Sequence, residues 1–165
     1  MAITELSDNE PLVTHVPALG HDLMVEGDVT GHPVHPPLRP LFPGGLRSEI
    51  YSLDGASDVG LGLLVNGWCG VVGMPELQGA QMRRWGVDAS RLVMVSSPRG
   101  WLATVAALVE ELDVVYACAP PVMSVQASRR LATRLRARRS TLVICGGWPS
   151  AVTHIDVRTI GWWKS

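Results

Sequence analysis

From about residue 47 onward, short apolar runs alternate with longer segments in which apolar residues recur every three or four positions. The short runs predict strands at 48–53, 69–72, 91–95, 114–118 and 141–145. The periodic segments predict helices over 76–85, 101–112 and 124–139. A looser alternation over 154–163 predicts an edge strand. Strands that alternate with helices are typical of an α/β fold with a mostly parallel central sheet flanked by helices.

The two longer predicted helices each carry one apolar stripe, which we expect to pack against the sheet. The stripes are formed by Leu102, Val105, Leu108, Val109 and Leu112 in the first helix and by Ala127, Leu131 and Leu135 in the second.

Residues 1–43 differ from the rest of the chain. They hold six acidic residues and one basic residue, Arg39, and they end in a stretch with five prolines, at positions 33, 36, 37, 40 and 43. Proline fixes φ and removes a hydrogen-bond donor, which favours an extended, polyproline-like segment over helix or sheet. We therefore expect an acidic, proline-rich arm or linker over 1–43 and one α/β domain over 44–165.

Composition indicates a folded domain in a reducing compartment. Apolar residues make up 47% of the 165 positions and charged residues 18%, enough to build one core. The three cysteines lie apart in apolar runs without a CxxC or a grouped histidine set, so no structural metal is expected. No apolar run reaches the roughly 18 residues of a membrane span. We expect a cytoplasmic protein.

The turn after the first predicted strand contains most of a phosphate-binding loop. The pattern GxxxxGK[ST] needs its glycines so that backbone N–H groups can wrap phosphates, its Lys for the outer phosphates and its hydroxyl for magnesium. Gly55 and Gly60 keep the glycine spacing, but Leu61 replaces the Lys and Gly62 replaces the hydroxyl residue. Asp58 adds a negative charge that would repel phosphate. The loop is therefore predicted to be degenerate.

The other half of a nucleotide-hydrolysing site is also missing from the sequence. A magnesium-binding Asp should end an apolar strand, yet the run 114–118 ends in Cys118, and Asp113 stands at its beginning. Glu76 follows the second predicted strand and is better explained as a helix-start carboxylate. We expect no cofactor, no metal, no catalytic residue and no enzymatic activity.

Several stretches taken in order resemble a known family. They are 44–50 (GGLRSEI), the degenerate loop, 71–77 (VVGMPEL), 85–88 (WGVD), 90–95 (SRLVMV), 112–115 (LDVV), 128–132 (SRRLA) and 146–149 (GGWP). This series resembles the ImuA family, especially its actinobacterial ImuA-prime form, within the RecA-like superfamily. The resemblance covers about 44–163. It implies a RecA-like fold and a role in the damage-inducible mutasome, with an ImuB-type Y-family polymerase homologue and an error-prone C-family DNA polymerase as partners. It also implies association with the nucleoid when the protein acts at DNA damage.

Two groups of residues are candidates for docking a partner or DNA. The last predicted helix carries six arginines, which pair well with phosphate or acidic side chains but equally suit a solvated helix face: Arg129, Arg130, Arg134, Arg136, Arg138 and Arg139. Trp148, Trp162 and Trp163 near the C-terminus suit either an interface or the core, and core packing is favoured. With a net charge of −1, only weak DNA contact is expected.

Three functions remain open at this point. The first is a non-catalytic adaptor in error-prone translesion synthesis. The second is a SulA-like inhibitor of the tubulin-like division protein, which is also induced by DNA damage. The third is a residual RecA-like NTPase that uses an unusual loop and Glu76.

Overall fold

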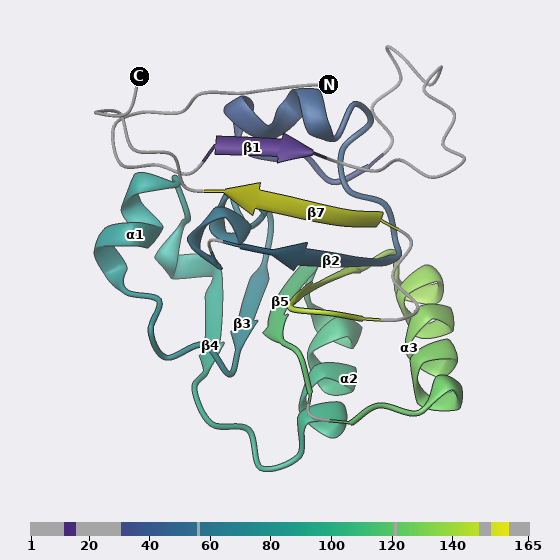
Figure 1. The fold of residues 1–165 in the computed structure, drawn as a ribbon. Coiled ribbons are helices and arrows are strands. Elements are labelled where there is room, and N and C mark those ends of the chain that lie inside the picture. The colour runs from purple at the N-terminus through teal and green to yellow at the C-terminus, as the bar shows by residue number, and fades with distance from the viewer. Residues whose placement is uncertain (1–11, 16–30, 56, 121, 149–152, 159–165) are drawn as a thin grey trace.

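The computed structural model describes residues 12–15, 31–55, 57–120, 122–148 and 153–158, and its centre is a seven-stranded sheet (Figure 1). The strand order is β1-β7-β2-β6-β5-β3-β4. The six strands from β7 to β4 are parallel, and β1 pairs antiparallel with β7. The strands are β1 (Leu12–His15), β2 (Ile50–Asp54), β3 (Cys69–Val72), β4 (Leu92–Val95), β5 (Val114–Cys118), β6 (Thr141–Cys145) and β7 (Thr153–Arg158).

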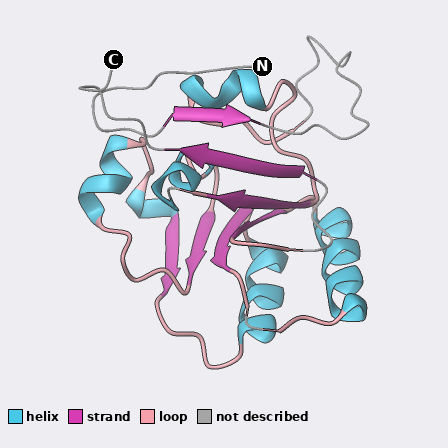
Figure 2. Ribbon diagram, in the orientation of Figure 1, coloured by secondary structure: helices cyan, strands magenta, loops and turns pink. Residues whose placement is uncertain are grey.

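Helices cover both faces of the sheet (Figure 2). On one face lie the regular helices α2 (Trp101–Glu111) and α3 (Val125–Arg138), over a core that includes Val115 and Ile144. On the other lie α1 (Gly79–Arg84) and two 3-10 helices, η1 (Pro36–Leu41) and η2 (Ser57–Leu63), over Tyr116 and Val143. A third 3-10 turn, η3 (Ala89–Arg91), leads into β4. Because neighbouring residues of one strand point to opposite faces, the strands supply both cores.

The predicted α/β fold class is confirmed: a mostly parallel central sheet is flanked by helices. Strands β3, β5 and β6 have the predicted bounds. Helix α3 begins where the sequence predicts, because the Ser124 hydroxyl caps it by accepting a hydrogen bond from the Ala127 N–H at 3.0 Å.

Two helix predictions need correction. The helix expected over 76–85 begins only at Gly79, because the Gln78 N–H donates to Gln81 Oε1 at 2.8 Å and so caps the helix there. In α2, Val105 and Val109 are fully buried as predicted, but Leu102 is 40% exposed. The apolar stripe is therefore narrower at the start of α2 than its periodicity indicates.

The proline-rich stretch is not an extended arm in the described residues. Residues 36–41 form η1, and Val34, Leu38 and Phe42 are buried in the same core as the sheet. The polyproline interpretation of this stretch is wrong. The apolar residues between the prolines are buried against the sheet, and this burial stabilises the compact form. Residues 1–11 and 16–30 lie outside the described part.

The predicted C-terminal edge strand exists over Thr153–Arg158 but is not at the edge. Strand β1, from the segment expected to be an arm, pairs with β7 on its outer side. Strand β7 therefore lies between β1 and β2. Such a pairing, which joins the two ends of the chain, cannot be deduced from local periodicity.

Candidate functional site

The degenerate loop follows β2 at the carboxyl edge of the sheet, where α/β proteins usually bind ligands. Gly55 leaves the strand with a φ of 108°, a conformation that favours glycine. Residues 57–63 then form η2, in which the five residues from Val59 to Leu63 are all buried. Leu61, at the position of the expected Lys, is 0% exposed. The loop therefore packs as part of the core rather than exposing its backbone N–H groups in an open cradle.

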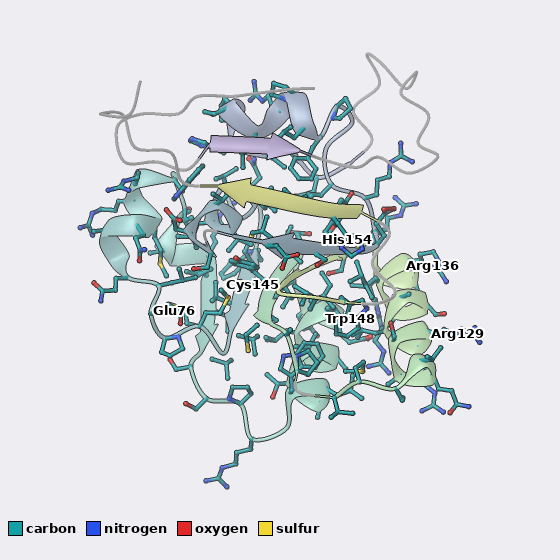
Figure 3. All side chains as sticks on the ribbon, in the orientation of Figure 1. Glu76, Arg129, Arg136, Cys145, Trp148 and His154 are labelled. Carbon is teal, nitrogen blue, oxygen red and sulfur yellow. The ribbon has the colours of Figure 1, made fainter. Side chains whose placement is uncertain are left out.

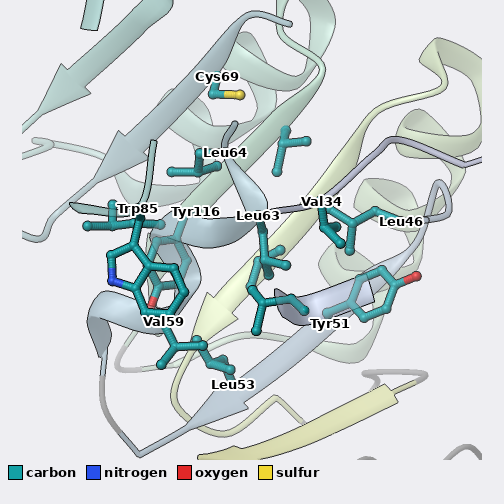
Figure 4. Close-up of a cluster of buried hydrophobic side chains, with 14 of the residues drawn as sticks. Val34, Leu46, Tyr51, Leu53, Val59, Leu63, Leu64, Cys69, Trp85 and Tyr116 are labelled. Carbon is teal, nitrogen blue, oxygen red and sulfur yellow. The ribbon is translucent and has the colours of Figure 1, made fainter. Parts of the chain in front are cut away.

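Close packing explains the glycines of this loop. A Cβ at Gly60 would overlap the ring of Tyr116, and one at Gly62 would lie 2.6 Å from Leu38 Cδ1 and 2.9 Å from Trp85 Cε3. Figure 4 shows Tyr116 and Trp85 gathered with Val59 in this cluster. The glycine spacing that resembles a phosphate loop thus lets two aromatic rings approach the backbone.

Two hydrogen bonds hold η2 against these rings. The Tyr116 hydroxyl donates to the Ser57 carbonyl oxygen at 2.7 Å, and the Trp85 indole N–H donates to Asp58 Oδ2 at 3.3 Å. Asp58 therefore has a structural partner in addition to the charge that the sequence analysis noted. Sequence reasoning missed both contacts, because Tyr116 and Trp85 are distant in the chain from the loop and nothing in their local pattern indicates which segment they meet.

The carboxyl end of β5 carries Cys118 in register with Cys145 at the end of β6. Burial raises the pKa of the Cys145 thiol, and the nearby carboxylates of Glu76 and Asp54 raise it further. Burial likewise raises the pKa of Tyr116 well above its ordinary value. These groups are therefore protonated near neutral pH. Glu76 is exposed, at the same edge of the sheet as Cys145 (Figure 3).

Asp113 lies at the amino end of β5, at the edge opposite the loop, as the sequence predicts. Its Oδ2 accepts a hydrogen bond from the Trp68 backbone N–H at 2.9 Å, so it holds the turn that leads into β3. In the part of the chain that the structure describes, no group of three or more His, Cys, Asp or Glu side chains is placed to hold a metal ion.

The arginines of α3 divide into two groups. All six are exposed, but Arg134 and Arg138 form ion pairs with Glu110 of α2, at 3.5 Å and 2.7 Å. Glu110 belongs to the preceding helix, so this pairing cannot be deduced from the sequence around the arginines. The other four have no ion pair with any residue that the structure describes: Arg129, Arg130, Arg136 and Arg139.

Trp148 is not available for docking. It is 2% exposed, its indole N–H donates to Ser128 Oγ at 3.0 Å, and its ring packs at a tilt against Trp101. Its assignment to a docking surface is therefore wrong, and core packing, the favoured alternative, holds (Figure 3). Trp162 and Trp163 lie outside the described residues.

Comparisons with known proteins place the chain in a family. No curated protein matches the sequence. Among solved structures, SulA from Pseudomonas aeruginosa is similar, with 18% sequence identity and a TM-score of 0.43, over 59% of this chain and 98% of that one. Among the described residues, no helix is both long and apolar enough to cross a bilayer. Residues 40–150, about two thirds of the sequence, match the family of the MT3502 N-terminal domain. The chain therefore belongs to the MT3502 N-terminal domain family.

Proposed function

We propose that this domain is a non-catalytic adaptor of the damage-inducible mutasome, which supports error-prone translesion synthesis through protein contacts. Its proposed partners are an ImuB-type Y-family polymerase homologue and an error-prone C-family DNA polymerase. The partners rest on the ordered sequence resemblance to the ImuA family.

The burial of η2 is the observation that carries the non-catalytic part of the proposal. A nucleotide at this edge needs several free backbone N–H groups and a Lys beside its phosphates. Here Leu61 is 0% exposed, and Gly62 packs against Leu38 and Trp85. To admit phosphates, η2 would have to leave the core, which would expose the apolar surface of its five buried residues to water. The fold is thus better suited to presenting surfaces than to gripping a nucleotide.

The four arginines without ion pairs, three on α3 and Arg139 at its C-cap, are the surface that we propose for docking. Exposed guanidinium groups suit the carboxylates of an acidic partner surface and, more weakly here, DNA phosphates. Arg134 and Arg138 have their charge matched by Glu110 and are expected to contribute less. We therefore propose that the four unpaired arginines contact the partner and that Arg134 and Arg138 hold α3 against α2.

Co-purification with the ImuB-type homologue tests the proposal. The intact chain should capture it, and replacing Arg129, Arg130, Arg136 and Arg139 together by Gln should weaken capture at least about tenfold, the equivalent of 1.4 kcal/mol. The Arg134→Gln and Arg138→Gln double variant should bind nearly normally, and the Arg129→Gln and Arg136→Gln double variant, which removes the same number of charges, should bind more weakly than it does. Capture of the tubulin-like division protein in place of the ImuB-type homologue would favour the SulA-like alternative. ATP turnover that Glu76→Gln abolishes would favour an NTPase.

A further inference from the structure

A cavity of about 400 Å³ opens at the amino edge of the sheet, opposite η2. It lies where β2 and β6 begin, and the residues that line it include Gly31, His32, Arg47, Ser48, Arg139 and Thr141. Its volume lies in the range of about 300 to 1,000 Å³ that is typical of small-molecule sites.

The lining of this cavity is positively charged. Arg47 and Arg139 are both exposed, and neither forms an ion pair with another residue in the described ranges. The lining contains no acidic side chain. Guanidinium groups offer several N–H donors in a planar fork that matches the oxygens of a phosphate group. The electrostatics therefore favour an anion, and the geometry favours one with several oxygens.

Both arginines stand on constrained backbone. The Arg47 N–H donates to the Tyr51 hydroxyl at 2.9 Å, and its carbonyl oxygen accepts from Thr141 Oγ1 at 2.7 Å. Arg139 ends α3 with a φ of 55° and is the one non-glycine residue with positive φ in the described part of the chain. Glycine is the usual residue at such a helix end, and strained residues concentrate at functional sites. An Arg at this position thus keeps a charge at the cavity at some cost in stability.

We propose that this cavity binds a small phosphate-bearing anion, with Arg47 and Arg139 as its principal ligands. The Ser48 hydroxyl can donate a further hydrogen bond from the same edge. His32 also lines the cavity, but its Nε2 is buried from solvent, so the proposed polar contacts come from the two arginines and Ser48. The site is separate from the degenerate loop and does not depend on the mutasome proposal.

Calorimetric titration of the full chain with inorganic pyrophosphate tests the site, with orthophosphate in a parallel arm. Pyrophosphate should bind more tightly, because two phosphate groups can engage both arginines. Arg47→Gln and Arg139→Gly should each weaken binding at least about tenfold. Arg139→Gly suits the backbone at this position, and urea unfolding of each variant verifies that the fold is kept. Arg129→Gln, at the other end of α3, is the charge-matched control and should change affinity less than about twofold.

The proposal is overturned if the unaltered chain does not bind pyrophosphate, or if Arg129→Gln weakens binding as much as Arg139→Gly. The second outcome would mean general attraction to a basic surface. A short single-stranded oligonucleotide that displaces pyrophosphate and binds more tightly would identify the site as a nucleic-acid contact instead. Chemical-shift changes confined to the amino edge on addition of pyrophosphate would support the proposal.

Discussion

The two edges of the central sheet are built in opposite ways. At the carboxyl edge, the degenerate loop that keeps the glycine spacing of a phosphate-binding loop is a buried 3-10 helix with a leucine in place of the lysine. At the amino edge, two exposed arginines flank an open cavity. A position in a fold therefore does not by itself make a binding site. Packing decides which backbone groups are free, and charge decides what they can hold.

The largest effect should come from restoring the phosphate-loop residues. We expect Leu61→Lys with Gly62→Ser to lower the free energy of unfolding by about 4 kcal/mol or more, because it buries a charge and overpacks the core. It should not create ATP binding. Urea unfolding and a nucleotide-binding titration measure both outcomes. Leu61→Met, which conserves volume, is the control and should cost less than about 1.5 kcal/mol. A stable double variant that binds ATP would remove the contrast between the edges.

Adding a single methyl group at Gly60, at the same edge, should have the next largest effect on the free energy of unfolding. Gly60→Ala places a Cβ against the Tyr116 ring, and we expect it to destabilise the fold by about 3 kcal/mol because the ring is fully buried and held by Ser57. Gly147→Ala is the matched control, since a Cβ there meets nothing within 4 Å. Urea unfolding of the two variants measures the difference in their free energies of unfolding. Equal stability of the two variants would show that η2 yields easily, contrary to the packing described above.

Features of the two edges that depend on neighbouring residues can be predicted from the sequence, and features that depend on contacts between distant residues cannot. Strands β3, β5 and β6 were predicted with correct bounds because β-branched runs flanked by turn residues determine them locally. The loss of the phosphate-loop lysine could likewise be read from one position, Leu61. The reason for Gly60 and Gly62 could not be deduced from the sequence, because it depends on Tyr116 and Trp85. These two residues reach the loop only in the folded chain.

The amino-edge cavity was missed for a similar reason. Arg47 precedes β2 and Arg139 ends α3, so the fold brings together residues that are far apart in sequence. The sequence grouped Arg139 with its helical neighbours, whereas its φ of 55° turns the chain there toward β6. The prolines of 33–43 likewise favour an extended segment, whereas the burial of Leu38 and Phe42 decides the conformation. Sequence-local patterns predict the helices and strands well, but they do not predict the tertiary contacts between them.

Thr141→Val tests how the amino edge is held together, and its effect should be smaller. The variant keeps the shape of the side chain but removes the hydrogen bond from Thr141 Oγ1 to the Arg47 carbonyl oxygen. We expect a loss of about 1 kcal/mol in the free energy of unfolding, and weaker pyrophosphate binding because Arg47 is less well placed. Thr141→Ser, which retains the donor, should preserve the binding. If Thr141→Val leaves binding unchanged, this hydrogen bond does not position Arg47.

The smallest expected effect is a gain in stability. Arg139→Gly relieves a left-handed conformation that costs an L-residue about 1 to 2 kcal/mol, while glycine adds flexibility to the unfolded chain, so we expect a net gain of about 0.5 kcal/mol. Ala137→Gly, two residues earlier and within α3, should instead lose about 1 kcal/mol. Opposite signs for these neighbouring substitutions in urea unfolding would mean that Arg139 is kept at the cavity despite its backbone. A loss of stability in both variants would mean that the Arg139 side chain stabilises the helix end and that its left-handed backbone carries no net strain.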